Sequence, residues 1–292
     1  MEPLVPEGPH SPSALAPLLA RPRYEVLPLP SVLDQTGALP EDTVVTVTAS
    51  PRRGTGATVE LCEKLAAQRL HAVPHLAARQ CTGRGELREM LARLDGAGIE
   101  EVFVVGGDAA QPAGPYPDGL ALLRAMADLG LLPARIGVPS YPEGHPSIPG
   151  PALWSALRAK QPFAHYTVTQ LCLDGAAVCR FTATLREEGV DLPVVAGVPG
   201  TVEARSLLTI GLRIGVGDSL RFLRGHTSAA GRILRPGGYR PRRLLRTLDA
   251  ELERNRCALA GLHFYTFNRV GATARWVRRA HRRATRERGS AA

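Results

Sequence analysis

Short runs of apolar, mostly β-branched residues recur at regular intervals along the chain. They lie at residues 24–29, 43–49, 71–77, 101–107, 135–141, 166–173, 193–199 and 262–268. These runs are continuously apolar rather than alternating, which is typical of strands covered on both faces, as in a parallel sheet. The pattern therefore predicts eight strands of a parallel sheet.

The segments between these runs carry the three-to-four-residue periodicity of amphipathic helices, with Gly-containing stops and prolines at probable first turns. Residues 57–71 and 85–96 show it most clearly. Eight strand–helix alternations in about 270 residues predict an α/β fold, a single-domain (β/α)8 TIM barrel, rather than a doubly wound open sheet. The connection at 30–42 is too short for a full helix, and residues 200–261 are expected to hold at least two helices.

The composition is that of an ordinary soluble globular protein, with 44% hydrophobic and 22% charged residues in a chain of 292. No apolar run approaches the ~20 residues that span a bilayer, and the N-terminus lacks a signal-peptide pattern. We therefore expect a cytoplasmic protein with no membrane partner. The expected organisation is a flexible Pro-rich leader at 1–20, the barrel at 21–275 and an Arg-rich tail at 276–292. The five cysteines show no metal-ligand spacing, so reduced thiols are expected.

The net charge of +9 is concentrated near the C-terminus. Residues 231–292 carry 16 arginines and 4 acidic residues, whereas residues 1–230 carry 20 basic and 23 acidic ones. A nucleic-acid partner is one interpretation of such a basic segment. Trp276 is the only large aromatic residue among the terminal arginines, which makes a poor stacking platform for bases. A solvated terminal helix is therefore the favoured interpretation, and no nucleic-acid partner is expected.

Polar side chains follow seven of the eight predicted strands, at the end where barrels of this kind carry their chemistry. The seventh strand ends in GVPG and offers only backbone. The polar residues are Glu25, Thr48, His75, Asp108, Tyr141 with Glu143 and His145, Gln170 with Asp174, and Asn268 with Arg269. These strand ends are the candidate active site.

Glu25 lies inside an apolar strand, where a carboxylate has to be paired or protonated. Burial raises the pKa of a carboxyl group, which suits a general acid at neutral pH, although a structural ion pair is the alternative. Gln170 needs hydrogen-bond partners in a buried strand, and a ligand with a polar ring would supply them. Asp174 is expected to cap the next helix. His75 and His145 have no convergent third ligand, so no metal site is predicted.

Two motifs are specific enough to indicate a family. They are YPEGHP at 141–146 and HFYTFNR at 263–269, and Glu25, VTVTA, PHL, GD, Lys160 and TQ-x-x-x-D accompany them in a fixed order. At these residues the chain resembles the methylenetetrahydrofolate reductase family, from residue 24 to about 275.

This resemblance implies an oxidoreductase on a barrel that binds FAD at the strand C-termini. NADH or NADPH would reduce the flavin, and hydride would then pass to 5,10-methylenetetrahydrofolate to give 5-methyltetrahydrofolate. By position, Glu25 resembles the general acid, Asp108 the carboxylate near flavin and folate, and Gln170 the residue that binds the pterin. The positions that resemble flavin contacts are Thr48, His75, Gly107, Asp108, Tyr141, His145 and Lys160.

The chain departs from the family pattern where an arginine is expected to hold the flavin's polar tail. Gly106 stands in its place, and an aspartate expected shortly before Lys160 is also absent. We expect FAD to be retained with other cations, for which Arg52, Arg53, Arg79 and the arginines of 232–246 are candidates.

Three alternatives stay open. They are direct hydride transfer without flavin, a paralogue that oxidises methyltetrahydrofolate in one-carbon catabolism, and a folate-dependent methyltransferase. Glu25 and the YPEGHP loop disfavour the last of these, because methyl transfer needs no such acid–flavin pair. Homo-oligomers and either nicotinamide cofactor are compatible with the sequence.

Overall fold

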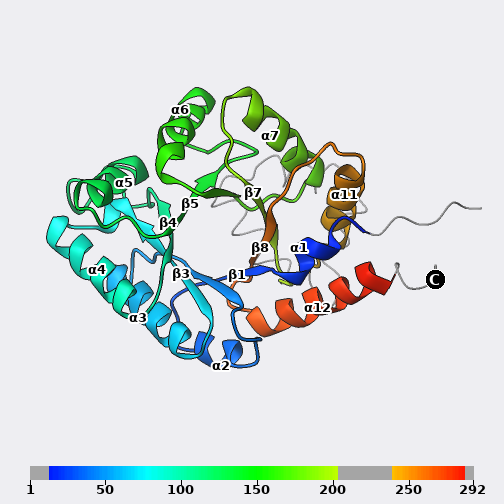
Figure 1. Ribbon diagram of the computed structural model, residues 1–292, viewed down its shortest axis with the longest axis horizontal. Helices are drawn as coiled ribbons and strands as arrows, with labels where there is room; N and C mark the ends of the chain where they lie inside the picture. The colour runs from blue at the N-terminus through cyan, green and yellow to red at the C-terminus, as the bar shows by residue number, and fades with distance from the viewer. Residues whose placement is uncertain (1–12, 203–238, 287–292) are drawn as a thin grey trace, which may run out of the picture.

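The computed structural model describes residues 13–202 and 239–286, which form a closed barrel of eight parallel strands in sequence order (Figure 1). Each strand pairs with the next, and β8 closes the ring on β1, with Arg23 opposite His263 and Glu25 opposite Tyr265. The strands are β1 (Arg23–Val26), β2 (Val44–Val47), β3 (His71–Ala77), β4 (Glu101–Val105), β5 (Arg135–Ser140), β6 (Tyr166–Thr169), β7 (Val194–Pro199) and β8 (Gly261–Tyr265). The predicted (β/α)8 barrel is confirmed.

Helices surround the strands and alternate with them along the chain (Figure 1). The short connection after β1 holds a helix of only five residues, in keeping with its length. The helices are α1 (Ala16–Ala20), α2 (Val32–Thr36), α3 (Gly54–Ala67), α4 (Arg84–Gly96), α5 (Gly119–Asp128), α6 (Gly150–Lys160), α7 (Gly175–Glu187), α11 (Arg242–Glu253) and α12 (Val270–Arg286). Two 3-10 turns, η1 (Ala78–Gln80) and η2 (Gln161–Phe163), complete the described elements. The expectation of a second helix in 200–261 falls largely on residues 203–238, outside the described part.

The strands are buried on both faces, as their continuous apolar runs predicted. Successive side chains of a strand point to opposite faces. Outward-facing residues such as Val45, Ile136 and Phe264 belong to the main core with the helices. A separate cluster fills the barrel interior, and it consists of Val73, Phe103, Tyr166, Val168 and Val195. The polar residues of the site therefore project from strands that packing fixes on both sides.

Two aspartates cap helices that follow barrel strands. Asp174 accepts a hydrogen bond from the backbone N–H of Ala176 and starts α7, as predicted. Asp118 accepts from Ala121 and starts α5. Each carboxylate satisfies one of the N–H groups left free in a first helical turn.

The bottom of the barrel is tied together by a buried charge network. Glu101 of β4 pairs with Arg23 of β1, lies 2.9 Å from His71 Nε2 and 3.6 Å from Arg135 Nε. Burial alone would raise the pKa of Glu101, but the His71 hydrogen bond and the Arg23 charge outweigh it and hold the pKa at about 2. Arg23 also donates to the Tyr166 hydroxyl at 2.9 Å. The network joins β1, β3, β4, β5 and β6 at the end opposite the predicted site.

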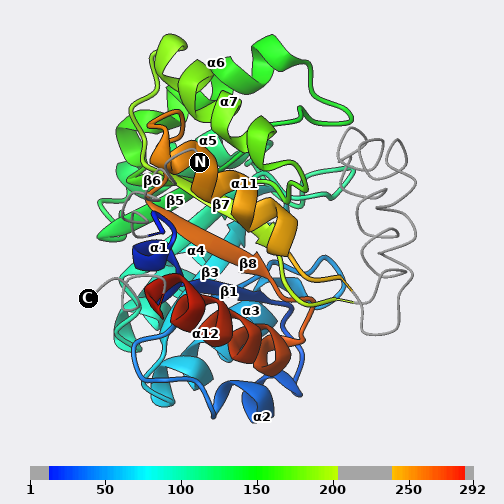
Figure 2. The ribbon, with the colours of Figure 1, turned by 90° about the vertical axis from the view of Figure 1, so that its right-hand side faces the viewer.

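Helix α12 packs on α1, so the folded unit includes residues on both sides of the expected barrel limits (Figure 2). Leu15, Ala16 and Leu19 are buried in the main core, and α12 runs without interruption through positions 275 and 276. Trp276 and Val277 are buried on its inner face. Its exposed face carries Arg275, Arg278, Arg279, Arg282, Arg283 and Arg286. The arginines from 275 to 286 thus belong to an amphipathic helix, and the prediction of no nucleic-acid partner stays a prediction.

The cysteine expectation needs a correction. Cys179 of α7 forms a disulfide with Cys257, which precedes β8, so the expected set of five reduced thiols is wrong for this pair. The fold brings together two residues 78 positions apart, and nothing in the spacing indicated that. Cys62, Cys81 and Cys172 are buried. Among the described helices, none has the length and apolar character needed to cross a membrane.

Candidate active site

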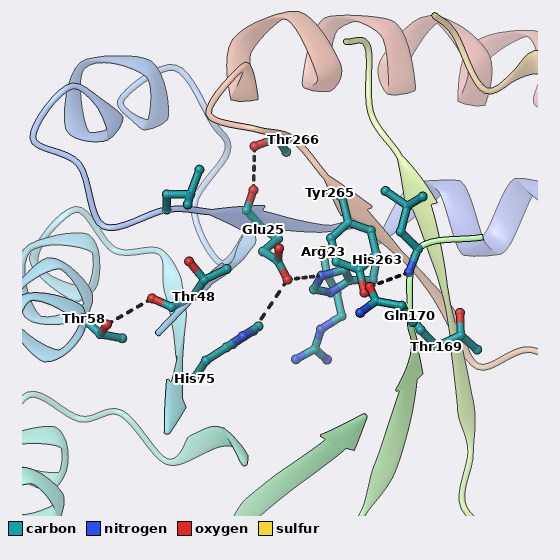
Figure 3. Close-up of polar contacts among 12 residues, drawn as sticks. Arg23, Glu25, Thr48, Thr58, His75, Thr169, Gln170, His263, Tyr265 and Thr266 are labelled. Atoms are coloured by element: carbon teal, nitrogen blue, oxygen red, sulfur yellow. Dashed lines mark hydrogen bonds and ion pairs between the residues drawn. The ribbon is translucent and has the colours of Figure 1, made fainter. Parts of the chain in front are cut away.

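Glu25 projects from β1 between two imidazoles (Figure 3). Its Oε2 is hydrogen-bonded to Nε2 of His263 at 3.1 Å and lies 3.9 Å from Nε2 of His75. The Glu25 side chain is 16% exposed, and those of His75 and His263 are 9% and 2% exposed. The three side chains come from β1, β3 and β8, so closing the barrel is what assembles them.

Burial governs the acidity of all three groups. It raises the pKa of Glu25 to about 7, against a smaller opposing effect of His75. It lowers the pKa of His75 to about 4, partly offset by the negative charge of Glu25. It lowers the pKa of His263 to about 3, and the positive charge of Arg23 adds to this effect. A carboxylic acid that holds its proton up to neutral pH therefore lies beside two neutral imidazoles, as a general acid requires.

The backbone around Glu25 is held by the turn that follows β8. The hydroxyl of Thr266 donates to the Glu25 carbonyl (Figure 3), and Asn268 exchanges two hydrogen bonds with the backbone of Leu27. Asn268 adopts a positive φ of 59°, a conformation that asparagine tolerates better than most residues. Three residues of HFYTFNR, namely His263, Thr266 and Asn268, therefore position Glu25.

Several buried polar atoms near Glu25 have no hydrogen-bond partner among the described residues. They include Oγ1 of Thr48, just after β2, Nε2 of His75 and Nδ1 of His263. Thr48 is fixed through its backbone, since its N–H donates to Val26 and its carbonyl accepts from Thr58. His75 is fixed by its contact with Phe103, at 4.7 Å between ring centroids. Unsatisfied buried polar atoms are uncommon, and a bound ligand is one explanation for them.

Asp108, Tyr141 and His145 come together at the rim of the barrel. The exposed Asp108 follows β4, and its charge acts on both Tyr141 and His145. The two rings meet edge to face at 5.1 Å between centroids. Burial raises the pKa of the Tyr141 hydroxyl and lowers that of His145. Gly107 precedes Asp108 with a φ of +91°, and a Cβ there would lie 3.1 Å from Cβ of Ala77, so this position suits glycine.

Tyr265 links the rim to the Glu25 group. Its hydroxyl donates to the Thr169 carbonyl at 3.0 Å, and its ring contacts that of His263 at 4.9 Å. Burial raises the pKa of Tyr265 well above its ordinary value, and the charges of Glu25 and Tyr141 add to the shift. Gly197 of β7 leaves the space for this ring, because a Cβ there would lie 2.8 Å from Cε2 of Tyr265.

Gln170 follows β6, and hydrogen bonds hold both its backbone and its side chain. Its backbone N–H donates to Ser140, and its side-chain Oε1 accepts from the N–H of Leu171 at 2.8 Å. The carbonyl end of the amide is thus used internally, which leaves the NH2 end for a ligand.

Lys160 lies apart from the Glu25 group, at the last position of α6. It is half-buried; burial lowers the pKa of its ammonium group, and the charge of Asp118 opposes the shift. No hydrogen bond joins it to Glu25 or the histidines in the part of the chain that the structure describes.

Arg79, a candidate to replace the arginine missing at Gly106, contacts the loop that follows β4. Its three guanidinium nitrogens donate to the carbonyls of Ala109, Pro117 and Ala110 at 2.6, 2.9 and 2.7 Å. These bonds use three of its five N–H groups to hold the loop that begins after Asp108, and its role in binding a diphosphate stays a prediction. Arg52 and Arg53 are exposed directly before α3, where a helix N-terminus also favours an anion.

Sequence reasoning missed His263, Tyr265 and Thr266 as site residues. It recognised the HFYTFNR motif but took only Asn268 and Arg269 as strand-end residues. The available signal was the two-residue period of a strand, which places His263 and Tyr265 on one face, opposite to the apolar Phe264.

Comparison with known proteins identifies the family. The sequence profile of "Methylenetetrahydrofolate reductase" matches residues 29–210, which is more than half of the chain. The chain belongs to the methylenetetrahydrofolate reductase family. The match includes Thr48, His75, Asp108, Lys160 and Gln170. Glu25 and the HFYTFNR turn lie outside it, so their place in the site rests on the geometry above.

Two solved structures resemble this reductase family member at low sequence identity. An uncharacterized protein from Clostridium thermocellum, whose description says that it binds two copies of 5-methyl-5,6,7,8-tetrahydrofolic acid, is 12% identical. The likeness covers 91% of this chain and 98% of that one, with a TM-score of 0.58. An oxaloacetate acetylhydrolase in complex with 3,3-difluorooxalacetate is 12% identical over 82% of this chain and 93% of that one, with a TM-score of 0.44.

Proposed function

We propose that this protein interconverts 5,10-methylenetetrahydrofolate and 5-methyltetrahydrofolate with NADH or NADPH, and that Glu25 is its general acid. The observation that carries the proposal is a buried carboxyl group whose pKa is raised to about 7, held 3.1 Å from His263 at the strand ends of a barrel. Membership of the reductase family supports it, as does the folate bound by the Clostridium thermocellum protein.

The chemistry requires a proton at one nitrogen of the folate's one-carbon bridge, so that the bridge opens to a reactive iminium cation. At neutral pH about half of the Glu25 carboxyl groups carry such a proton. The exposed carboxylate of Asp108 would stabilise the positive charge of the iminium. The NH2 end of Gln170 is the group available to a pterin ring, since its Oε1 is taken by Leu171.

The residues present fit a flavin ring, which supports FAD as cofactor. The unsatisfied Thr48 Oγ1 and His75 Nε2 would bind its polar edge, and Gly107 lets the backbone approach a flat ring. Tyr141, His145, Asp108 and Lys160 are the further residues that would hold it. FAD would supply the relay of hydride between nicotinamide and folate. Arg52 and Arg53 are the cations we assign to its diphosphate in place of the arginine missing at Gly106.

Direct hydride transfer from the nicotinamide is the second candidate, and a specific observation favours it. Gly106 supplies no charged side chain near Asp108, and Arg79 directs three of its five N–H groups to loop carbonyls, which leaves fewer charged donors for a diphosphate. The role of Glu25 toward the folate is the same in both candidates, and in the reverse oxidation of methyltetrahydrofolate it would accept the proton instead.

An absorption spectrum of the purified protein, followed by anaerobic addition of NADH and then of methylenetetrahydrofolate, tests the proposal. We expect a flavin band that NADH bleaches and the folate restores. A colourless protein that still oxidises NADH when folate is present would establish direct transfer. A protein that stays inert with FAD, either nicotinamide and folate supplied would contradict the proposal.

A further inference from the structure

His263 is placed to control the carboxyl group of Glu25 rather than to react itself. It is 2% exposed, its Nε2 is hydrogen-bonded to Oε2 of Glu25, and its Nδ1 is buried without a partner among the described residues (Figure 3). With Nδ1 enclosed in this way, the side-chain hydrogen bond of the ring among the described residues is the one to Glu25, and no second bond at Nδ1 relays a proton through the ring.

We propose that His263 is a positioning residue that donates its Nε2–H to Oε2 of Glu25 and so leaves the acidic proton on Oε1. A neutral imidazole has one donor and one acceptor nitrogen. The Nε2–H tautomer leaves only a lone pair unsatisfied at Nδ1, whereas the other tautomer would leave a buried N–H without an acceptor. No described residue hydrogen-bonds Oε1, so that oxygen is the one available to the substrate. The hydrogen bond from His263 to Glu25 does not depend on the proposed function, whereas its effect on catalysis rests on that function.

The surroundings of the carboxyl group support this assignment. His75 on β3 lies 3.9 Å from Oε2, beyond hydrogen-bond distance, so His263 is the imidazole that binds it. Tyr265 on β8 directs its hydroxyl to Thr169, and Arg23 on β1 is engaged with Glu101 and Tyr166. Thr48 on β2 is uncharged. Because the pKa of each imidazole lies far below neutral, neither competes with Glu25 for its proton.

Two substitutions of similar size separate this role from simple packing. In His263→Gln the side-chain amide nitrogen reaches the position of Nε2, so the hydrogen bond to Oε2 is kept. In His263→Asn the shorter side chain reaches only the position of Nδ1, so the bond is lost. His281→Gln on α12, outside the barrel, is the matched control.

The direct readout is a pH titration of the Glu25 carboxyl group by infrared absorption of its protonated C=O band, identified by its loss in Glu25→Gln. Donation to the carboxylate favours the charged form, so His263→Asn should raise the midpoint by about one pH unit or more. His263→Gln and His281→Gln should leave it within about half a unit of the original. A midpoint that does not move in His263→Asn, or that moves downward because the imidazole had been an acceptor, would overturn the proposal.

The second readout is the reaction with folate. His263→Asn should slow it about tenfold to a hundredfold, His263→Gln should restore most of the rate, and the alkaline limb of the pH profile should follow the infrared midpoint. A loss shared equally by the Asn and Gln variants would also overturn the proposal. If the midpoint moves as expected while even the unaltered protein does not turn over folate, the proposed function fails and the positioning of Glu25 by His263 stands.

Discussion

Glu25 and its two neighbouring imidazoles ionise in the reverse of their usual order. The ordinary pKa values are 4.5 for the carboxyl group and 6.5 for the imidazoles, but here they are about 7 for Glu25, 4 for His75 and 3 for His263. Burial in a largely apolar barrel disfavours each charged form, which raises the pKa of an acid and lowers that of a base. The site therefore keeps a proton on a carboxyl group at a pH where water would have removed it.

This shift gives the proposed folate reaction a pH dependence. The acidic form of Glu25 is lost as the pH rises through about 7, so the rate with methylenetetrahydrofolate should fall about tenfold for each further pH unit. Stopped-flow measurements at pH 6 to 9 would show it. Glu25→Gln should remove the dependence along with most of the rate, and a flat profile in the unaltered protein would contradict the role of Glu25.

The same shift affects stability. Because the folded pKa of Glu25 lies above its ordinary 4.5, protonation favours the folded state. Its contribution is fully present below pH 4.5 and is lost as the pH rises through about 7.

Position 197 requires glycine, because β7 passes too close to β6 and Tyr265 to leave room for a side chain. A Cβ at this position would lie 2.2 Å from the Thr169 carbonyl oxygen and 2.8 Å from Cε2 of Tyr265. Gly197→Ala should therefore destabilise the protein by about 1–3 kcal/mol through overpacking and displace Tyr265 from its place beside His263. Urea denaturation together with the folate reaction rate would measure both effects.

Gly85→Ala is the matched control for this substitution. Gly85 lies in α4, and a Cβ there would meet nothing within 4 Å. Its stability should equal or slightly exceed that of the original, since alanine is the better helix former. Equal effects of the two substitutions would contradict the packing assigned to Gly197.

At the scale of elements, β8 and the turn after it hold β1 in place. His263 binds the Glu25 side chain, Thr266 binds the Glu25 carbonyl, and Asn268 binds the backbone of Leu27. The closing seam of the barrel and the site of its acid are therefore the same pair of strands. Any slip of β8 against β1 would move Nε2 of His263 out of hydrogen-bond reach of the Glu25 carboxyl group.

The Glu101 network at the bottom of the barrel stabilises the fold in which β8 closes on β1. Arg23→Met should cost about 3–5 kcal/mol, because it removes one partner of a buried charge and leaves Glu101 with weaker compensation. Urea denaturation at pH 7 measures the loss. Lys64→Ala, which breaks an exposed pair with Glu60 on α3, is the control and should show no measurable change. A similar small effect of both substitutions would contradict a structural role for the Glu101 network.

At the scale of the whole molecule, the barrel could be predicted from sequence. Strands buried on both faces require continuous apolar runs, and such runs are visible in the sequence. The eight apolar runs each overlap one of the eight strands, and the polar residues in or just after them include Glu25, Thr48, His75 and Asp108. No pattern in the sequence indicates which strand ends lie next to one another in the barrel. The contact of Glu25 with His263 joins residues 238 positions apart, and only the closure of β8 on β1 creates it.

Two other features depended on tertiary contacts that the sequence does not encode locally. The Cys179–Cys257 disulfide requires α7 and the segment before β8 to lie side by side. Arg79 looked like a free cation near a phosphate loop, but the loop after β4 turns its carbonyls onto that guanidinium. In both cases long-range packing determines what a side chain is available to do.

The separation of the two half-reactions in Glu25→Gln tests the central claim most directly. Anaerobic stopped-flow absorption would follow reduction of the proposed flavin by NADH and, separately, its reoxidation by methylenetetrahydrofolate. Since the acid is needed only to open the folate's one-carbon bridge, the substitution should leave the NADH step within about twofold and slow the folate step by about a hundredfold or more. Equal loss in both steps, or an unchanged folate step, would contradict the assignment of Glu25 as the acid that acts on folate.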